Sequence, residues 1–242
     1  MQLGDFTELA ANYRHRPGYS MQVLSLLHKE ISSHGTRPTR FADVGAGTGK
    51  LTDALLSLGL SGYAVEPNDN MRQEGERLLG NPSLEWKKGS AEATSLPDAC
   101  VDWVLMASSF HWARTTEALA EFHRILRPGG YFTVIYNPRD TRTEGLQKEM
   151  DDAIRKLVPE LKRNSSGASA YTHDLEQKLL STGHFTDPIF IEAPYEIAMS
   201  RERYIGVWKS VNDIQVQAGP ERWNAFLNLL ENTINTQTFP YP

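Results

Sequence analysis

Short apolar runs alternate with amphipathic segments between residues 40 and 137. The runs are rich in aliphatic and aromatic residues and are bounded by Gly, Pro, Asn or charged positions, which is typical of buried strands. They occupy Phe41–Val44, Tyr63–Val65, Leu84–Lys87, Val101–Ala107 and Tyr131–Tyr136. Helical spacing covers the intervals Leu51–Leu58, 69–79 and Thr116–Leu126. Strands that alternate with helices predict right-handed crossovers and a parallel sheet with helices on both faces.

Most of the remaining chain has helical spacing. Apolar residues with that spacing predict helices over 20–34, 144–158, 175–180, 201–211 and 220–234. Phe185–Ile197 has an extended pattern and is expected to form a sixth strand. Pro128-Gly129-Gly130 predicts a turn before the fifth strand.

These elements predict a single α/β domain over residues 1–242. Its centre is a Rossmann-like, doubly wound, mostly parallel sheet over 40–137. We expect a helical cap over 140–175 and 199–236 that sets ligand choice. Residues 1–20 are expected to form a mobile N-terminal flap that orders on ligand binding, because the cationic cluster Arg14, His15 and Arg16 has no evident anchor in the sequence.

Composition narrows the class of protein. The 242 residues contain 25 Lys and Arg against 30 Asp and Glu, and this net charge of -5 disfavours a nucleic-acid partner. The single cysteine, Cys100, excludes an intramolecular disulfide and a cysteine-based zinc site. Metal-ligand spacings such as HExxH are missing, so no metal is expected. No apolar run approaches the ~20 residues of a membrane span, and we expect a cytoplasmic protein, monomeric or homodimeric.

The sharpest local signal is DVGAGTGKL at residues 43–51, between a predicted strand and a predicted helix. Gly45, Gly47 and Gly49 allow positive φ and close backbone approach, and a helix N-terminus offers free N–H donors. Glu66 ends the next strand, where a carboxylate can accept both hydroxyls of an adenosine ribose. The pattern therefore predicts a nucleotide-type ligand, with a ligand-free tight turn as the alternative.

The glycine spacing separates two common nucleotide loops from this one. A dinucleotide fingerprint requires its third glycine at position 50, which is Lys50 here. A Walker loop requires four residues between its glycines and a following Lys-Ser or Lys-Thr, which residues 45–52 lack. An NAD-linked oxidoreductase is consequently disfavoured.

Four motifs together resemble the class I S-adenosylmethionine-dependent methyltransferases, over roughly residues 40–137. DVGAGTGKL looks like their first motif, and AVEPNDNM (64–71) looks like their second-strand acid with its following Pro and Met. GSAEATSLPDACVDWVLMASSFHW (89–112) and ALAEFHRILRPGGYF (118–132) resemble the later blocks. SSFHW and YRHRPGYS (13–20) look most like the small-molecule branch called type 11, which includes trans-aconitate-type methyltransferases.

The resemblance implies S-adenosylmethionine as the cofactor, S-adenosylhomocysteine as its product, and a sheet order of 3-2-1-4-5-7-6. Gly45, Ala46, Gly47 and Gly49 would pass under the methionine part, and Asp43 would support the loop or accept from the amino group. Further contacts are implied for ribose, adenine and methionine at Glu66, Pro67, Met71, Ser90, Ala91, Glu92, Ser108 and Ser109. Tyr13 and Arg14 or Arg16 would come from the flap, since an Arg suits a carboxylate. Only TQTFPYP follows the last predicted helix, so we expect the chain to stop before a seventh strand.

His111 is the candidate general base. It lies just past the fourth strand, at the carboxyl edge where open α/β sheets bind ligands. Substrate contact without proton transfer and a structural role are its alternatives. Tyr19, Trp112, Tyr136 and Trp208 are candidates for an aromatic substrate pocket, with ordinary helix packing as the alternative for each.

The predicted function is methyl transfer to a small-molecule acceptor, through a carboxylate, hydroxyl, amine or activated carbon. A carboxylate acceptor needs no base, whereas the others call for one when a proton must leave. One alternative is a catalytically silent module that still binds the cofactor. Another is a methyltransferase that acts on a macromolecule.

Overall fold

The computed structural model describes residues 10–33, 38–139, 145–162 and 172–237. It divides the chain into two compact units. The first, called here the α/β unit, comprises Gly18–Tyr136 and Ser169–Tyr195. The second, the helical unit, comprises Met1–Pro17, Asn137–Ala168 and Glu196–Pro242.

Five parallel strands build the sheet of the α/β unit, in the order β3-β2-β1-β4-β5. They are β1 (Arg40–Val44), β2 (Ser61–Val65), β3 (Leu84–Lys87), β4 (Val101–Ala107) and β5 (Leu126–Ile135). The chain winds outward from β1 to β3 and then returns to β4 on the other side of β1. The order therefore reverses between β1 and β4, which is the place where ligands bind in open parallel sheets.

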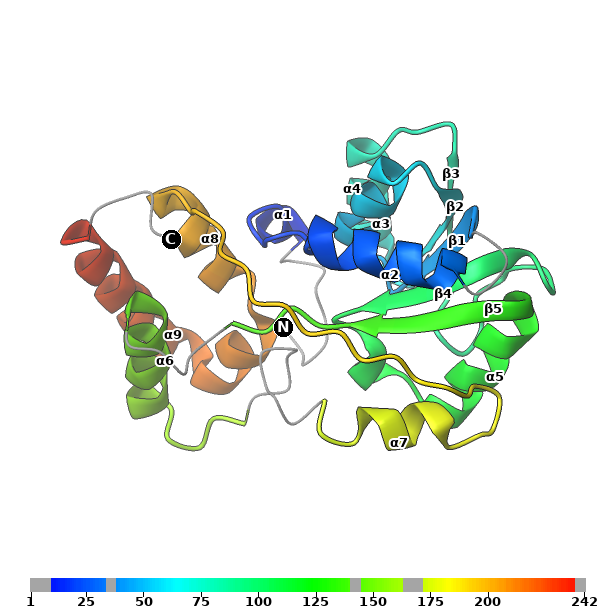
Figure 1. The fold of residues 1–242 in the computed structure, drawn as a ribbon. Helices are drawn as coiled ribbons and strands as arrows, with labels where there is room; N and C mark the ends of the chain where they lie inside the picture. The colour runs from blue at the N-terminus through cyan, green and yellow to red at the C-terminus, as the bar shows by residue number, and fades with distance from the viewer. Residues whose placement is uncertain (1–9, 34–37, 140–144, 163–171, 238–242) are drawn as a thin grey trace. The chain divides into compact units, whose positions relative to one another are not determined.

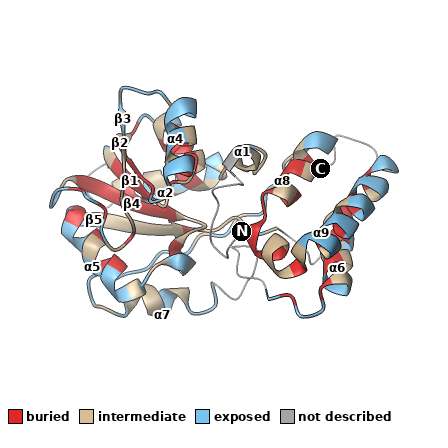
Figure 2. Cartoon of the chain, turned by 180° about the vertical axis from the view of Figure 1, so that it is seen from behind, coloured by how far each residue is buried: buried red, intermediate tan, exposed pale blue. Residues whose placement is uncertain are grey.

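Helices cover both faces of this sheet, as Figure 1 shows. One face carries α2 (Met21–Ser33), α3 (Lys50–Ser57) and α4 (Asp69–Leu78), and the other carries α5 (Thr115–Ile125) and α7 (Leu175–Leu180). Alternate strand residues supply the two cores: Trp103 and Leu105 pack toward α2 and α3, and Val104 and Met106 toward α5. The central strands are buried on both sides, and the outer faces of the helices are exposed (Figure 2).

The helical unit has a core of its own. It contains α1 (Ala10–Tyr13), α6 (Leu146–Leu157), α8 (Arg201–Lys209) and α9 (Asn212–Asn235), and α9 is kinked where Gly219 has a φ of 69° before Pro220. Trp208 and Phe226 meet edge to face at 4.9 Å between ring centroids. Such aromatic burial contributes substantially to the stability of a small helical unit.

The structure differs from the sequence prediction at the start of the fifth strand, where a turn was expected. β5 begins at Leu126, and Pro128-Gly129-Gly130 lies inside it as an irregularity, because the pairing shifts between Val101 opposite Leu126 and Trp103 opposite Tyr131. Gly129 adopts a φ of 76° there. The turn-forming residues thus make a bulge within the strand, as glycine permits.

The predicted sixth strand is wrong. Within the described residues, Phe185–Ile197 joins no strand ladder, and Phe190 is 80% exposed. Pro188 and Pro194 remove two backbone donors from a segment of 13 residues, which weakens its ability to pair. Residues 238–242, which hold most of the predicted ending, lie outside the described part of the chain, as do 140–144 and 163–171 of the predicted cap and 1–9 of the predicted flap.

The described part of the predicted flap, residues 10–17, makes side-chain contacts that the sequence did not reveal. Arg16 donates from Nε to Ser210 Oγ and from Nη2 to Ser210 O, both at 2.8 Å. Its guanidinium also lies 4.1 Å from the centroid of the Tyr13 ring. Arg203 Nε donates to His15 O at 3.1 Å. These contacts tie residues 13–16 to α8 within the helical unit.

Candidate active site

The glycine loop leaves β1 and turns sharply into α3. The amides of Gly45 and Ala46 both donate to Val65 O of β2, at 2.8 and 3.1 Å, which holds the start of the loop at the strand ends. Gly45, Gly47 and Gly49 have φ values of 71°, 60° and 86°. Residues with a Cβ rarely adopt these values, so the three glycines are required by the backbone path itself.

Side chains approach this loop closely on two sides. A Cβ added to Gly45 would lie 2.9 Å from Ser109 Oγ, and one added to Gly47 would lie 3.3 Å from Met71 Cε. Two predicted cofactor residues, one after β4 and one on α4, therefore touch the loop. Met71 and Ser109 thus border the loop backbone at the carboxyl edge of the sheet.

Glu66 fastens the loop to the start of α4. Its Oε2 accepts from the Gly47 amide at 2.8 Å, and its Oε1 accepts from the Asn68 amide at 2.9 Å. The side chain is 7% exposed, and burial raises the pKa of Glu66 although these two amides and Arg72 work to lower it. Each carboxylate oxygen keeps a second lone pair. The carboxylate can thus support the loop and still accept hydroxyl donors.

Asp43 lies beneath the loop and is fully buried. Thr52 Oγ1 donates to its Oδ2 at 2.6 Å, whereas its Oδ1 has no hydrogen-bond partner among the described residues. Burial raises the pKa of Asp43 from 3.8 to about 7, and the hydrogen bonds from Thr52 reverse only part of that effect. A buried oxygen without a partner is costly, and a ligand that donates to it removes the cost.

The residues predicted to border the adenine, 90–92, form a turn that is held by a hydrogen bond between its own side chains. Ser90 Oγ donates to Glu92 Oε2 at 2.9 Å, while Glu92 Oε1 accepts from the Arg114 amide at 2.8 Å. Ala91 is buried between them. Asn68, two residues past Glu66, caps α4 by accepting from the Met71 amide at 3.1 Å, and Pro67 is exposed in the same turn. These contacts fix Met71 and the 90–92 turn.

Ser108 and Ser109 follow β4 in a strained turn. Ser108 has a φ of 52° and its hydroxyl accepts from Tyr19 Oη at 3.1 Å. Ser109 Oγ donates to Val44 O at 3.4 Å. A non-glycine residue with positive φ is uncommon and often marks a functional turn. Tyr19, predicted as a substrate residue, is therefore held beside a predicted cofactor residue.

His111 lies two residues beyond Ser109, in the short 3₁₀ helix η2 (Phe110–Trp112). Its ring centroid is 4.8 Å from that of Trp112 and 6.1 Å from that of Tyr136, which follows β5. His111 and Tyr136 line a pocket of about 140 Å³ together with Phe110, Thr115 and two residues of α7, Leu175 and Lys178. Trp112 is 45% exposed. Three predicted residues from two strand ends thus gather at one place.

Three predicted residues belong to the helical unit. Tyr13 is stacked under Arg16, Arg14 is exposed, and Trp208 is fully buried in the core of that unit beneath the Arg139 guanidinium. The structure gives Trp208 a packing role. Contacts of these three residues with cofactor or substrate stay predictions.

Asn68, Thr52 and Lys178 were not predicted from the sequence. Asn68 is visible in retrospect as a helix-capping residue after Glu66-Pro67, and Thr52 as a hydroxyl in the first turn after the glycine loop. Lys178 carries no local signal, because only tertiary packing of α7 brings it to the pocket.

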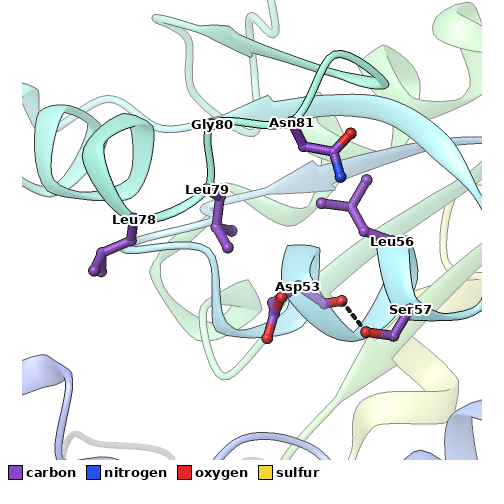
Figure 3. Close-up of a pocket in the computed structure, with 7 residues that line it drawn as sticks. All are labelled: Asp53, Leu56, Ser57, Leu78, Leu79, Gly80 and Asn81. Carbon is purple, nitrogen blue, oxygen red and sulfur yellow. Dashed lines mark hydrogen bonds between the residues drawn. The ribbon is translucent and has the colours of Figure 1, made fainter.

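A second pocket, of about 330 Å³, lies between α3 and the end of α4 (Figure 3). Asp53, Leu56, Leu79 and Asn81 are among its lining residues, and the Asp53 carbonyl accepts from the Ser57 hydroxyl at 2.9 Å. None of the predicted site residues lines it. We therefore assign the chemistry to the strand ends and not to this larger pocket.

The residues at the strand ends fit S-adenosylmethionine. Gly45 and Gly47 place bare backbone beside Ser109 and Met71, and Asp43 Oδ1 is a buried acceptor without a partner among the described residues, which suits a donor such as the amino group of the methionine part. In the described residues, no three His, Cys, Asp or Glu side chains are grouped to bind a metal ion. No described helix is long and apolar enough to cross a membrane.

Comparisons with known proteins agree with this geometry. Residues 42–134 match a family model described as a methyltransferase domain. An uncharacterized methyltransferase of Mycobacterium tuberculosis is 35% identical over 154 residues, which are 64% of this chain and 60% of that protein. A malonyl-[acyl-carrier protein] O-methyltransferase of Geobacter sulfurreducens is 31% identical over 134 residues, 51% of this chain and 48% of that one. The matched regions thus span less than two thirds of these relatives.

The fold is shared with solved structures. A crystal structure from Anabaena variabilis, described as a "putative methyltransferase from antibiotic biosynthesis pathway", superposes with a TM-score of 0.58 and 22% identity, covering 86% of each chain. The sheet order, the glycine loop with its acid and the family model all coincide over the same residues. Residues 42–134 therefore match a methyltransferase domain, and the sheet that they build has the fold of solved methyltransferases.

Proposed function

We propose that this protein transfers a methyl group from S-adenosylmethionine to a small-molecule acceptor. The observation that carries the proposal is a continuous series of contacts at the sheet edge. Glu66 holds Gly47 of the loop, Gly45 touches Ser109, and two residues later His111 lines the adjoining pocket with Tyr136. A cofactor on the loop and an acceptor in the pocket would be neighbours.

The residues of this protein would act mainly by positioning the cofactor and the acceptor. When bound, S-adenosylmethionine supplies a methyl group that is already activated by the positive charge on sulfur. Asp43 Oδ1 would accept from its amino group, and Glu66 would accept from its ribose hydroxyls. Placing two reactants in line is worth an effective molarity of ~10⁵ M or more, so positioning accounts for most of the rate.

His111 is the group that would take a proton from the acceptor. Its ring centroid lies 6.1 Å from that of Tyr136, and both residues line the pocket. A general base contributes ~10²–10⁴ in rate when the acceptor atom must lose a proton, and nothing when the acceptor is already an anion. Acceptor choice therefore decides whether His111 acts as a base or only as a contact.

Several further features support a small-molecule reaction. The net charge of -5 favours free metabolites over nucleic acid. The single cysteine suits the reducing environment of the cytoplasm, where we place the reaction, carried out by a monomer or a homodimer. The pocket beside His111, at about 140 Å³, is smaller than the ~300 Å³ of pockets for drug-sized ligands.

Isothermal titration of the cofactor tests the proposal. S-adenosylmethionine and S-adenosylhomocysteine should bind the wild-type protein with one site each. Glu66→Ala and Glu66→Gln should weaken binding by about 1.5–3 kcal/mol, the range for hydrogen bonds to a charged group. Glu85→Ala, which removes an exposed carboxylate on β3, is the control and should bind as the wild type does.

Unchanged affinity in both Glu66 variants would contradict the ribose assignment. No binding by the wild-type protein would contradict the proposed function as a whole. Thermal unfolding of each variant checks that the loop survives, because Glu66 also accepts from the Gly47 and Asn68 amides.

A further inference from the structure

The pocket beside His111 has an aromatic side and a cationic side. Phe110, His111 and Tyr136 are its aromatic lining residues, and Lys178 of α7 is its cationic one. Thr115 adds a hydroxyl. No carboxylate lines the pocket as it is described, so the charge it offers to an occupant is positive.

Packing of α7 places Lys178 at this position. Leu175 and Leu179 pack against the core on the α5 side of the sheet, and Lys178 lies one turn from Leu175, on the side that lines the pocket. Side chains three residues apart share a helix face, so Leu175 and Lys178 reach the pocket together. The place of Lys178 on α7 is thus set by partly buried leucines of a helix that packs on the sheet.

Lys178 also pairs with Asp174, its neighbour one turn earlier. Its Nζ lies 3.0 Å from Asp174 Oδ1, and the two side chains are 44% and 49% exposed. Exposed pairs of this kind contribute little to stability and are readily exchanged. An anionic ligand in the pocket therefore competes with Asp174 for the ammonium at small cost.

We propose that the methyl acceptor is a small aromatic acid whose carboxylate is bound by Lys178 and whose ring lies against His111 and Tyr136. The inference rests on the proposed function and specifies its substrate class. Ring stacking selects a planar molecule, since aromatic pairs gain energy beyond their buried area. The ammonium selects a negative charge, and the volume of about 140 Å³ suits a molecule with a single ring. Lys178 is then a specificity residue that contacts substrate.

The test compares an acid with its neutral isostere. In the presence of S-adenosylhomocysteine, 4-hydroxybenzoate and 4-hydroxybenzamide are titrated into the wild type, Lys178→Gln, Lys178→Glu and Asp174→Asn. The wild type should bind the acid about 10-fold or more tightly than the amide, as a hydrogen bond to a charged group implies. Lys178→Gln should abolish this preference, and Lys178→Glu should abolish acid binding.

Asp174→Asn is the matched control. It breaks the same ion pair but leaves the Lys178 charge in place, so it should keep or increase the preference for the acid. If Asp174→Asn loses the preference as Lys178→Gln does, Lys178 acts only through the ion pair and the proposal is overturned.

The affinity for S-adenosylhomocysteine distinguishes failure of the substrate class from failure of the proposed function. It should be the same in all four proteins. Normal cofactor binding with equal affinity for acid and amide, or with neither probe bound, overturns the substrate class alone. Failure of the wild type to bind S-adenosylhomocysteine overturns the proposed function and this inference with it.

Discussion

Asp43→Asn should make the folded protein more stable, and more so at high pH. Burial raises the pKa of Asp43 from 3.8 to about 7. The folded protein therefore retains a proton that the unfolded chain releases between these two pH values. Since the unfolded state then binds fewer protons, the free energy of unfolding falls as the pH rises through this window.

The size of the effect follows from the same numbers. One pKa unit corresponds to about 1.4 kcal/mol, so ionising Asp43 in the folded protein costs about 4 kcal/mol above pH 7, as an upper figure. Most of that cost develops between pH 5 and pH 8, where it grows by about 3 kcal/mol. Asparagine mimics the neutral acid, because its amide oxygen can replace Asp43 Oδ2 as the acceptor for Thr52. In the wild type, Thr52 Oγ1 donates to Asp43 Oδ2 at 2.6 Å.

Urea unfolding at pH 5 and pH 8, without ligand, measures this effect. The difference between Asp43→Asn and the wild type should widen at pH 8 in favour of the variant. Asp53→Asn, which removes an exposed carboxylate on α3, serves as the control and should run parallel to the wild type. Parallel profiles for Asp43→Asn and the wild type would refute the assignment of a buried, protonated Asp43.

Three other substitutions test separate parts of the structure. Gly49→Ala should cost about 1–3 kcal/mol of stability in urea unfolding, because its φ of 86° is unfavourable for alanine and the new Cβ would strike Leu79; a neutral result would contradict the loop geometry. Trp208→Ala should cost about 3–5 kcal/mol through the cavity it leaves, whereas the exposed Trp112→Ala should stay within about 0.5 kcal/mol. His111→Gln should lower kcat by ~10²–10⁴ for acceptors that lose a proton and leave carboxylate acceptors nearly unchanged, and an equal loss for both kinds would rule out a base.

The central sheet is predictable from the sequence because its signals are local. Val101–Ala107 is apolar at every position except Asp102 and is followed by two serines, and it forms β4 over the same range. The glycine loop and Glu66 are likewise local, since the loop joins one strand to its helix and the acid ends the next strand. Their contact at 2.8 Å follows from the pairing of two neighbouring parallel strands.

Long-range packing decides what the sequence pattern leaves open. Phe185–Ile197 has the composition of a strand, but a strand must also form backbone hydrogen bonds with an edge of the sheet. The two prolines of this segment remove donors that such pairing would use. Pro128 to Gly130 has the composition of a turn, yet pairing with β4 absorbs it into β5. Lys178 reaches the pocket only because leucines of α7 pack on the α5 side of the sheet, a contact no local pattern encodes.

Methyl transfer itself is the most direct test of the account. The protein is incubated with S-adenosylmethionine labelled in the methyl group and with a cell extract divided into small-molecule, protein and nucleic-acid fractions. We predict that label accumulates in the small-molecule fraction with the wild type, and that Gly47→Val, which places a side chain on the loop against Met71, abolishes the transfer. Label in the protein or nucleic-acid fraction, or cofactor binding with no transfer to any fraction, would contradict a small-molecule methyltransferase.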